Sequence, residues 1–275
     1  MFSVLVLTLN EERNLPRCLA SAAGCDDLVV LDSGSIDGTA AIARAAGARV
    51  LTRPFDNFAG QRNYAQRTIA FRHPWVFHLD ADEQFTPELF AECRARAADP
   101  AADLDGYLVA PKMLWQGRWI PHCTDFPAYQ ARFVRAPEFV FVEVGHGQRE
   151  GPAMRLGRMQ ASYLHDLSAG GEAEWLAKHH RYARAEAEHH FQTAGTGGER
   201  LWAGLFAREP LRRRRALKRL SYALPARPVL RFVYQYILRG GFLDGSAGLH
   251  YCRLLARYEG FTADALRQRR RAASR

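Results

Sequence analysis

Two aspartates one residue apart, Asp80 and Asp82, follow the apolar run Trp75–Leu79, which is typical of a buried strand. Two carboxylates in this arrangement can share a hard divalent cation, or one can bind the cation while the other accepts hydrogen bonds from a ribose. A cation held there could act as a Lewis acid on a phosphate leaving group. The alternative is a solvated acidic loop, so the pair alone does not decide between a site and a surface.

Two further polar clusters could also bind a nucleotide. Asp32-Ser33-Gly34-Ser35 closes the apolar run Leu28–Leu31, where one carboxylate with hydroxyl and amide donors could hold a base and a ribose. The alternative is that these four residues only form a turn and a helix N-cap, for which their types are well suited. Gln61-Arg62-Asn63 lies near the start of a predicted helix, where an arginine and the helix N-terminus favour phosphate. An ordinary exposed helix face is the alternative there.

The elements that would position these side chains alternate regularly along the N-terminal third of the chain. Apolar runs predict four strands, at Phe2–Leu9, Leu28–Leu31, Arg49–Thr52 and Trp75–Leu79. Helical patterns lie between and after them, at Asn14–Ala23, Thr39–Ala46 with Asp37 as its N-cap, Gly60–Phe71 and Pro87–Ala97. This order predicts a doubly wound α/β domain with a mostly parallel sheet. Ligands bind at the carboxyl ends of the strands in such sheets, and the polar clusters lie at those ends.

The pattern changes after about Gly106. Short apolar runs separated by Pro and Gly continue to about His165 and predict a mixed extension of the sheet with long loops over the site. From Glu172 to about Phe191 the composition is helical, and Gly195–Gly198 is a predicted linker. We therefore expect one domain over residues 1–195, with halves at 1–105 and 106–195, followed by a basic, amphipathic helical region at 196–275.

The composition indicates a folded chain with a polyanionic partner. Of the 275 residues 48% are hydrophobic, which is enough for a core, and the formal charge of +9 is concentrated after residue 200. Nucleic acid, acidic lipid and phosphate-bearing substrates are the candidate partners. The five cysteines show no disulfide or zinc spacing, and we find neither a signal peptide nor a run of roughly 20 apolar residues. A reducing, cytoplasmic location is therefore expected.

The polar clusters occur in a defined order, each at a predicted strand or helix end. They are Thr8-x-Asn10-Glu11, Asp32-Ser33-Gly34-Ser35-x-Asp37-Gly38-Thr39, Gln61-Arg62-Asn63 and Leu79-Asp80-Ala81-Asp82-Glu83. This set closely resembles the family 2 glycosyltransferases with the GT-A fold, and most of all the bacterial branch that builds lipopolysaccharide core and surface polysaccharide. The hypotheses of a dinucleotide-binding enzyme and of a P-loop enzyme lose their main support, because no G-x-G-x-x-G follows the first strand and no G-x-x-x-x-G-K occurs.

The resemblance implies an inverting transfer of a sugar from a nucleotide-diphosphate sugar, with Mg²⁺ or Mn²⁺ as cofactor. It assigns the nucleotide sugar to Thr8, Asn10, Glu11, Asp32, Ser33, Gln61, Arg62, Asn63, Asp80 and Ala81. Within this set Arg62 would face the diphosphate, while Asp80 would meet the ribose or the metal. Asp82 would be the main metal ligand. His165 is similar to a family histidine that returns to the site and can complete the metal site, although a plain loop histidine is the alternative.

An inverting transfer also needs a general base near the acceptor hydroxyl, usually a carboxylate. Relatives often carry Pro-Asp before an Arg-aromatic strand and Val-His-Glu after it. Here the strand is Arg132-Phe133, and the matching positions, Pro127-Ala128 and Gly145-His146-Gly147, lack both acids. The candidates that remain are Asp125 and Glu150, then Glu143, with His146 as a residue that could orient a neighbour or act itself. A catalytically idle relative that only binds nucleotide sugar is a further alternative.

The C-terminal region is basic and amphipathic. Arginines alternate with Phe, Tyr and Leu in Leu211–Leu220 and Arg227–Phe242, followed by Leu243-Asp244-Gly245, as expected for a helix in a membrane interface. Similar transferases act on lipid-linked acceptors, so we expect a lipid-linked glycan acceptor and a peripheral position on the inner face of the cytoplasmic membrane. The alternatives are a solvated basic face and a nucleic-acid-binding protein. Nucleic acid is not expected as a partner, because carboxylates at three strand ends would repel its phosphates.

Overall fold

The computed structural model describes residues 1–99, 103–144, 147–194, 206, 213, 216, 222 and 226–273. The chain divides into two compact units, one formed by Met1–Leu114 with Asp125–Ala169 and the other by Trp115–Thr124 with Gly170–Arg275. The second unit takes up the chain at residue 170 and also includes a segment from its middle, whereas the expected division lay at residue 195. The expected linker Gly195–Gly198 lies outside the described residues, as does Leu211–Leu220 apart from Arg213 and Ala216.

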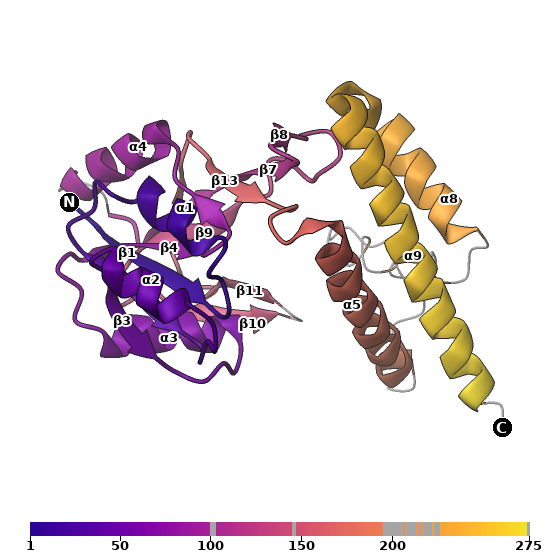
Figure 1. Cartoon of the computed structure of the whole chain (residues 1–275), viewed down its shortest axis with the longest axis horizontal. Helices are drawn as coiled ribbons and strands as arrows, with labels where there is room; N and C mark the ends of the chain where they lie inside the picture. The colour runs from indigo at the N-terminus through magenta and orange to yellow at the C-terminus, as the bar shows by residue number, and fades with distance from the viewer. Residues whose placement is uncertain are drawn as a thin grey trace. The chain divides into compact units, whose positions relative to one another are not determined.

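A seven-stranded sheet organises the first unit, in the order β12-β6-β9-β4-β1-β2-β3 (Figure 1). Its strands are β1 (Ser3–Thr8), β2 (Leu28–Asp32), β3 (Arg49–Thr52), β4 (Trp75–Asp80), β6 (Gly106–Val109), β9 (Gln130–Arg135) and β12 (Leu156–Arg158). β4, β1, β2 and β3 pair in parallel, β9 runs antiparallel to β4 and β6, and β12 is parallel to β6. The expected mostly parallel sheet with a mixed extension is therefore confirmed.

The helices packed on this sheet include α1 (Leu15–Ser21), α2 (Thr39–Ala45), α3 (Phe58–Thr68) and α4 (Pro87–Ala98). α3 begins before the expected Gly60, because the side chain of Asn57 accepts a hydrogen bond from the Gly60 amide and caps the helix there. The N-cap of α2 is Gly38 rather than the expected Asp37. Asp37 still supports the start of α2, since its Oδ1 accepts from the Thr39 amide at 3.0 Å.

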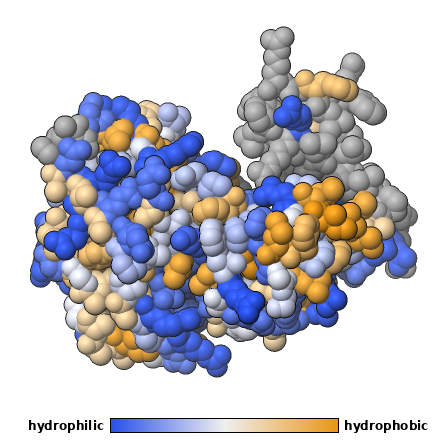
Figure 2. Space-filling model, turned by 90° about the horizontal axis from the view of Figure 1, so that it is seen from above, coloured by the Kyte–Doolittle hydropathy of each residue, from blue (hydrophilic) through white to orange (hydrophobic). Residues whose placement is uncertain are grey.

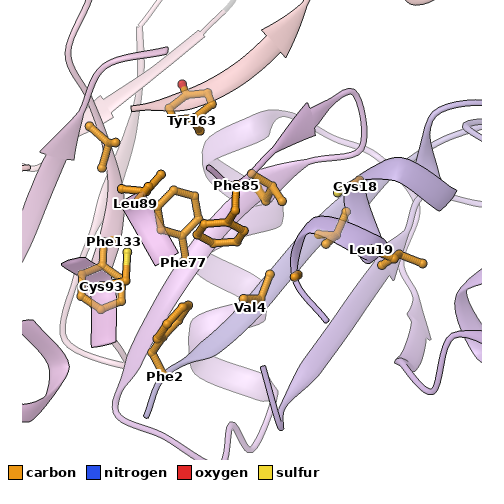
Figure 3. Packing of buried hydrophobic residues seen from close by; sticks show 14 of the residues in the cluster. Phe2, Val4, Cys18, Leu19, Phe77, Phe85, Leu89, Cys93, Phe133 and Tyr163 are labelled. Atoms are coloured by element: carbon orange, nitrogen blue, oxygen red, sulfur yellow. The ribbon is translucent and has the colours of Figure 1, made fainter. Parts of the chain in front are cut away.

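The central strands β1, β2 and β4 are buried on both faces, as their continuous apolar runs predict. Val4 of β1 packs in the cluster on the side of α1 and α4, whereas its neighbour Leu5 packs with Ala65 of α3 on the other side. Figure 3 shows the aromatic rings of the first cluster, in which the centroids of Phe77 and Phe85 are 4.5 Å apart. A fully buried ring of this kind contributes roughly 1.5–3 kcal/mol. This packing fixes β1 and β4, and with them the residues at their carboxyl ends.

A second sheet brings a distant segment to the end of β4. Its order is β5-β13-β7-β8, formed by β5 (Glu83–Gln84), β13 (Tyr163–Asp166), β7 (Pro111–Trp115) and β8 (Arg118–Trp119). β13 pairs antiparallel with β5, which sets His165 opposite Glu83 and so carries it to the end of β4. A separate hairpin of β10 (Phe141–Val144) and β11 (Gly147–Glu150) contacts α3.

The described part of the second unit is helical beyond residue 170. It contains α5 (Gly171–Ala194), α8 (Arg227–Phe232), the π-helix η1 (Val233–Leu238), the 3₁₀-helix η2 (Gly241–Asp244) and α9 (Gly245–Ala273). α5 belongs to this unit because it packs on α9, where Nε2 of His250 lies 2.9 Å from Oε2 of Glu172. Within the ranges that the structure describes, no helix is both long enough and apolar enough to cross a membrane.

Asp244 anchors the middle-chain segment Trp115–Thr124 to the start of α9. Its side chain is 2% exposed and lies 2.6 Å from Nδ1 of His122. The same carboxylate accepts a hydrogen bond from the Cys123 amide at 2.8 Å. Gln235 donates its side-chain amide to the Cys123 carbonyl at 2.8 Å, and the sulfurs of Cys123 and Cys252 are 3.4 Å apart. Asp244, which belongs to the Leu243-Asp244-Gly245 segment of the sequence, therefore binds His122 and Cys123 within its own unit.

Candidate functional site

Asp80, the last residue of β4, has both carboxylate oxygens paired with buried arginines. Nη2 of Arg62, from α3, donates to Oδ1 at 2.7 Å, and Nη2 of Arg132, from β9, donates to Oδ2 at 3.0 Å. The two arginine side chains are 1% and 4% exposed, whereas that of Asp80 is 28% exposed. Burial alone would raise the pKa of Asp80, but the two guanidinium groups hold it well below its usual range. Asp80 is therefore ionised and fixed in orientation, with part of its side chain open to a ligand.

Arg132 and Glu83 complete this charged cluster, although neither was among the predicted site residues. Nη2 of Arg132 also donates to Glu83 Oε1 at 2.7 Å, and Glu83 Oε2 accepts from the Asp80 amide at 2.9 Å. Glu83 is fully buried, and burial raises its pKa to about 7 against the opposing charge of Arg132. Glu83 thus fixes the turn after β4. The sequence carried a signal for both, because Arg132 opens the Arg-aromatic pair and Glu83 follows the acidic pair directly.

Asp82 and His165 lie beside this cluster and are partly open to solvent. Nε2 of His165 is 3.4 Å from Asp82 Oδ2, and its Nδ1 is 3.5 Å from Glu83 Oε1. Burial opposes protonation of His165, but Asp82 and Glu83 together raise its pKa to about 9. Ala81, between the two aspartates, is buried. The structure brings together Asp82 and His165, two of the three predicted metal ligands, and the third, Asp80, belongs to the neighbouring cluster. The role of all three in binding a metal stays a prediction.

Among the described residues, no group of three or more His, Cys, Asp or Glu side chains forms a complete metal site. The Asp82 carboxylate is nevertheless a suitable ligand for Mg²⁺ or Mn²⁺, and the His165 imidazole can join it once a bound cation displaces its proton. Mg²⁺ commonly takes one or two protein carboxylates together with substrate phosphates and water. The donor set therefore fits a cation that shares its coordination with a diphosphate.

The residues predicted to contact a nucleoside gather at the ends of β1 and β2. Thr8 and Asp32 face each other in the register of these strands, and the Thr8 hydroxyl donates to Asp32 Oδ1 at 3.1 Å. Asp32 Oδ2 also accepts from two amides of the turn that follows it. Asn10, with a φ of 55°, accepts from a further amide of that turn, and the Glu11 amide donates to the first residue of α2. These hydrogen bonds join the loop after β1 to the loop after β2. Contact of these residues with a nucleoside stays a prediction.

Gln61, Arg62 and Asn63 lie in the first half of α3 and have partners within the protein. Gln61 is 1% exposed, donates to two carbonyls of the loop after β3, and places Nε2 3.5 Å from Ser33 Oγ. Asn63 donates to the Phe141 carbonyl at 2.8 Å and accepts from the Phe141 amide at 2.9 Å. Gln61 and Arg62 are therefore not part of an exposed helix face. The Arg62 guanidinium binds Asp80, and its predicted contact with a diphosphate stays a prediction.

Two candidates for the general base lie on the β10–β11 hairpin. Glu150 pairs with Phe141 across the strands, and Glu143 pairs with Gln148 nearer the hairpin tip. Paired residues share a face of the hairpin. The ring of Phe141 lies 5.9 Å from the Arg62 guanidinium, so Glu150 is the carboxylate on the part of that face nearest the Asp80 cluster. Asp125 is exposed where the chain returns to the first unit, and His146 lies outside the described residues.

A mostly parallel sheet with polar and acidic side chains at the carboxyl ends of β1, β2 and β4 defines a GT-A type glycosyltransferase fold. The model of Glycosyl transferase family 2 matches residues 3–147, more than half of the chain, and the chain belongs to this family.

Curated relatives share part of this region. The lipopolysaccharide core biosynthesis glycosyltransferase LpsC of Rhizobium meliloti (strain 1021) is 38% identical over 101 residues, which is 32% of this chain and 37% of that protein. An uncharacterized glycosyltransferase of Rickettsia typhi, RT0209, is 34% identical over 88 residues, covering 32% of this chain and 30% of its own length. The matches thus span about a third of the length of these relatives.

Solved structures resemble the chain more distantly. Staphylococcus aureus TarS 1–349 covers 98% of this chain and 91% of its own, with 16% identity and a TM-score of 0.43. Glucosyl-3-phosphoglycerate synthase of Mycobacterium tuberculosis, in complex with Mn²⁺, uridine diphosphate and glucosyl-3-phosphoglycerate, covers 46% of this chain and 47% of its own. Its identity is 24% and its TM-score is 0.34.

Proposed function

We propose that the chain moves a sugar, with inversion, from a nucleotide-diphosphate sugar to a glycan acceptor. One observation carries this proposal: an ionised Asp80 held between two buried arginines stands beside Asp82 and His165 at the carboxyl end of β4. Burying guanidinium groups is costly. A solvated acidic loop does not need two buried arginines to orient one aspartate. A site that presents a fixed carboxylate to a ribose does need them.

On the donor side, Thr8, Asn10, Glu11 and Asp32 would bind the nucleoside, with Asp80 accepting hydrogen bonds from the ribose. Asp82 and His165 would hold Mg²⁺ or Mn²⁺ together with oxygens of the diphosphate. When bound, the cation would supply Lewis-acid stabilisation of the charge on the leaving nucleoside diphosphate. Arg62 and Arg132 would keep Asp80 ionised and in place while the donor enters.

On the acceptor side, a carboxylate would take the proton from the attacking hydroxyl, whose oxygen then bonds to the anomeric carbon as the diphosphate leaves from the opposite side. Glu150 is our first candidate for this base because it shares the face of Phe141, which lies over Arg62. Asp125 is the second, Glu143 follows, and His146 would orient the acceptor or the base.

We further infer that the acceptor is a lipid-linked glycan in the synthesis of bacterial lipopolysaccharide or another cell-envelope polysaccharide. The name of the Rhizobium meliloti relative supports this choice. The strongly basic C-terminal region supports a place at the inner face of the cytoplasmic membrane, where anionic lipids attract Lys and Arg.

The donor proposal is tested by thermal unfolding with a panel of nucleotide-diphosphate sugars, each with and without Mn²⁺ or Mg²⁺. A ligand that binds only the folded protein raises its apparent stability, by about 2.7 kcal/mol at a hundredfold excess over Kd. We expect one donor to raise the melting temperature, more so with the cation. Asp82→Asn should abolish the extra shift that depends on the cation.

Asp103→Asn is the matched control, because it makes the same chemical change at a side chain that is 84% exposed and away from the ends of β1, β2 and β4. It should respond to donor and cation like the unaltered protein. If no nucleotide sugar shifts the unaltered protein, or if Asp82→Asn keeps the full cation effect, the donor site proposed here is wrong.

A further inference from the structure

Exposed apolar side chains of the second unit are concentrated in one short stretch. The stretch comprises Val229, Leu230, Val233, Tyr234, Ile237, Leu238, Phe242 and Leu243, each of them at least 37% exposed. We name these eight residues the apolar face. Figure 2 shows one dense hydrophobic patch at the right of the view, besides smaller hydrophobic areas elsewhere on the surface. Isolated apolar residues on a surface are ordinary, but a contiguous group marks a contact with something else.

The helices that carry the apolar face have their polar side inward. Gln235 is 2% exposed and donates to the Cys123 carbonyl, and Arg227 is 8% exposed and donates through Nε to Glu259 at 3.2 Å. Ile237 and Leu238, by contrast, are 55% and 73% exposed. A helix on the surface of a water-soluble domain normally shows the opposite arrangement. The polar groups on the inward side therefore already have hydrogen-bond partners, and the outward side is suited to an apolar environment.

The charge of the sequence that carries this face points to the kind of surface that meets it. Between Glu209 and Asp244 the sequence contains nine Lys and Arg and neither Asp nor Glu. Residues 170–275 hold 21 of the 38 Lys and Arg but 9 of the 29 Asp and Glu, so the remainder of the chain is slightly acidic. Two copies of such a stretch would repel each other. Nucleic acid would match the charge but would gain little from aliphatic side chains.

We propose that the apolar face inserts shallowly into the head-group region of an anionic lipid bilayer, with α8 and η1 lying in the plane of the membrane. The twelve residues from Arg227 to Leu238 would span roughly 18 Å at 1.5 Å per residue, well short of the roughly 30 Å hydrocarbon core. Apolar side chains would enter the interface while arginines bind the head groups. The inference deepens the proposed function and rests on it in one respect, since a lipid-linked acceptor requires an enzyme that works at a membrane.

The test is flotation of the full chain with vesicles of phosphatidylglycerol and phosphatidylethanolamine, compared with vesicles of phosphatidylcholine. The double substitution Ile237→Asp with Leu238→Asp should lower binding to the anionic vesicles roughly tenfold or more, because two inserted side chains are lost. The matched control is Phe55→Asp with Phe58→Asp, which removes two exposed apolar side chains of the first unit and adds the same charge. The control should bind like the unaltered protein.

Three results would overturn the inference: unchanged flotation of the Ile237→Asp, Leu238→Asp protein, an equal loss in the control, or equal binding to phosphatidylcholine vesicles. Sedimentation is run alongside, because a dimer that only the apolar-face variant loses would show that a second copy covers this face, and would also overturn it. Thermal shift by nucleotide sugar is measured on the same proteins. Loss of flotation with donor binding intact supports the inference, while absent donor binding with intact flotation refutes only the proposed function.

Discussion

The guanidinium of Arg62 lies 2.7 Å from Asp80 Oδ1 and is buried beneath it, with a side chain that is 1% exposed. An arginine in the second turn of α3 thus stabilises an aspartate at the end of β4. Because Arg132 binds the other oxygen of the same carboxylate, the orientation of Asp80 is determined by two elements of the sheet-and-helix core. A ligand that enters does not need to order this side chain, which lowers the entropic cost of binding.

Replacing Arg62 with Ala should therefore weaken both the fold and donor binding. We expect the free energy of unfolding to fall by about 2–4 kcal/mol, since a partly buried carboxylate loses one of two partners. Urea unfolding measures this change, and a double-mutant cycle with Asp80→Ala should show strong coupling. Arg67→Ala, at an exposed position of the same helix, should change stability by less than about 0.5 kcal/mol. Additive effects of the Arg62 and Asp80 substitutions would show that the pair is not coupled.

Glu150→Gln should lower kcat for sugar transfer by roughly 10²–10⁴-fold while the affinity for the donor stays the same, because a general base acts on the acceptor hydroxyl. Initial rates with a saturating donor, together with donor titration, separate these two quantities. Glu143→Gln, on the same hairpin, tests the third candidate and should retain most of its activity. If Asp125→Asn showed the larger loss and Glu150→Gln kept near-normal turnover, the base would be Asp125.

Asp27 should make the fold sensitive to acid. Its carboxylate accepts from the Ser3 hydroxyl at 2.6 Å, the Arg72 amide at 2.8 Å and the Arg49 guanidinium at 2.8 Å. Burial opposes ionisation, but these donors lower the pKa of Asp27 below its usual value. The unfolded chain therefore binds the proton more tightly, so the stabilisation is complete above about pH 4 and is lost as the pH falls towards the folded-state pKa.

We expect Asp27→Asn to reduce the free energy of unfolding at pH 7 by roughly 1–2 kcal/mol, and the difference from the unaltered protein to shrink below about pH 4. Urea unfolding at pH 7, 5 and 3.5 measures this. Asp103→Asn should show little effect at any of these values. If the difference in the free energy of unfolding between Asp27→Asn and the unaltered protein were equally large at pH 3.5, the stabilisation would not depend on ionised Asp27.

Asp244→Ala should loosen the second unit around Cys123. The substitution leaves the amide of the buried Cys123 without its acceptor, which should cost roughly 1–3 kcal/mol. The His122 ring also loses its partner, but at 43% exposed it can bond to water instead. Thiol labelling followed by mass spectrometry should then show faster modification of Cys123 and Cys252. Cys18 and Cys93, both buried in the first unit, are internal controls. Equal protection of all four thiols would mean that Asp244 is dispensable.

The positions of the first four strands along the chain and of the acidic residues that follow them were predictable because they depend on local patterns. Continuous apolar runs identified β1, β2 and β4, and the residues directly after them had to lie at the carboxyl edge of a parallel sheet. The pairing of Arg132 with Asp80 was not predictable in this way. It depends on β9 lying antiparallel beside β4, a register between segments more than 50 residues apart that no local pattern encodes.

The partner of His165 illustrates the same limit. Its segment could be recognised from the residues around it, but its distance from Asp82 follows from the antiparallel pairing of β13 with the very short β5. The start of the second compact unit at residue 170 likewise has no local signal, because it depends on the side chains with which α5 packs on α9. Long-range packing decided each of these features.

The segment Trp115–Thr124 belongs to the second unit, while the chain on either side of it belongs to the first. The two units are thus not consecutive modules, and the polypeptide passes between them more than once. A gene fragment ending near residue 170 would encode Cys123 and His122 without the Asp244 that binds them. A transplanted segment of residues 170–275 would likewise carry Asp244 without the His122 and Cys123 that it binds, so the second unit can be moved intact only together with Trp115–Thr124.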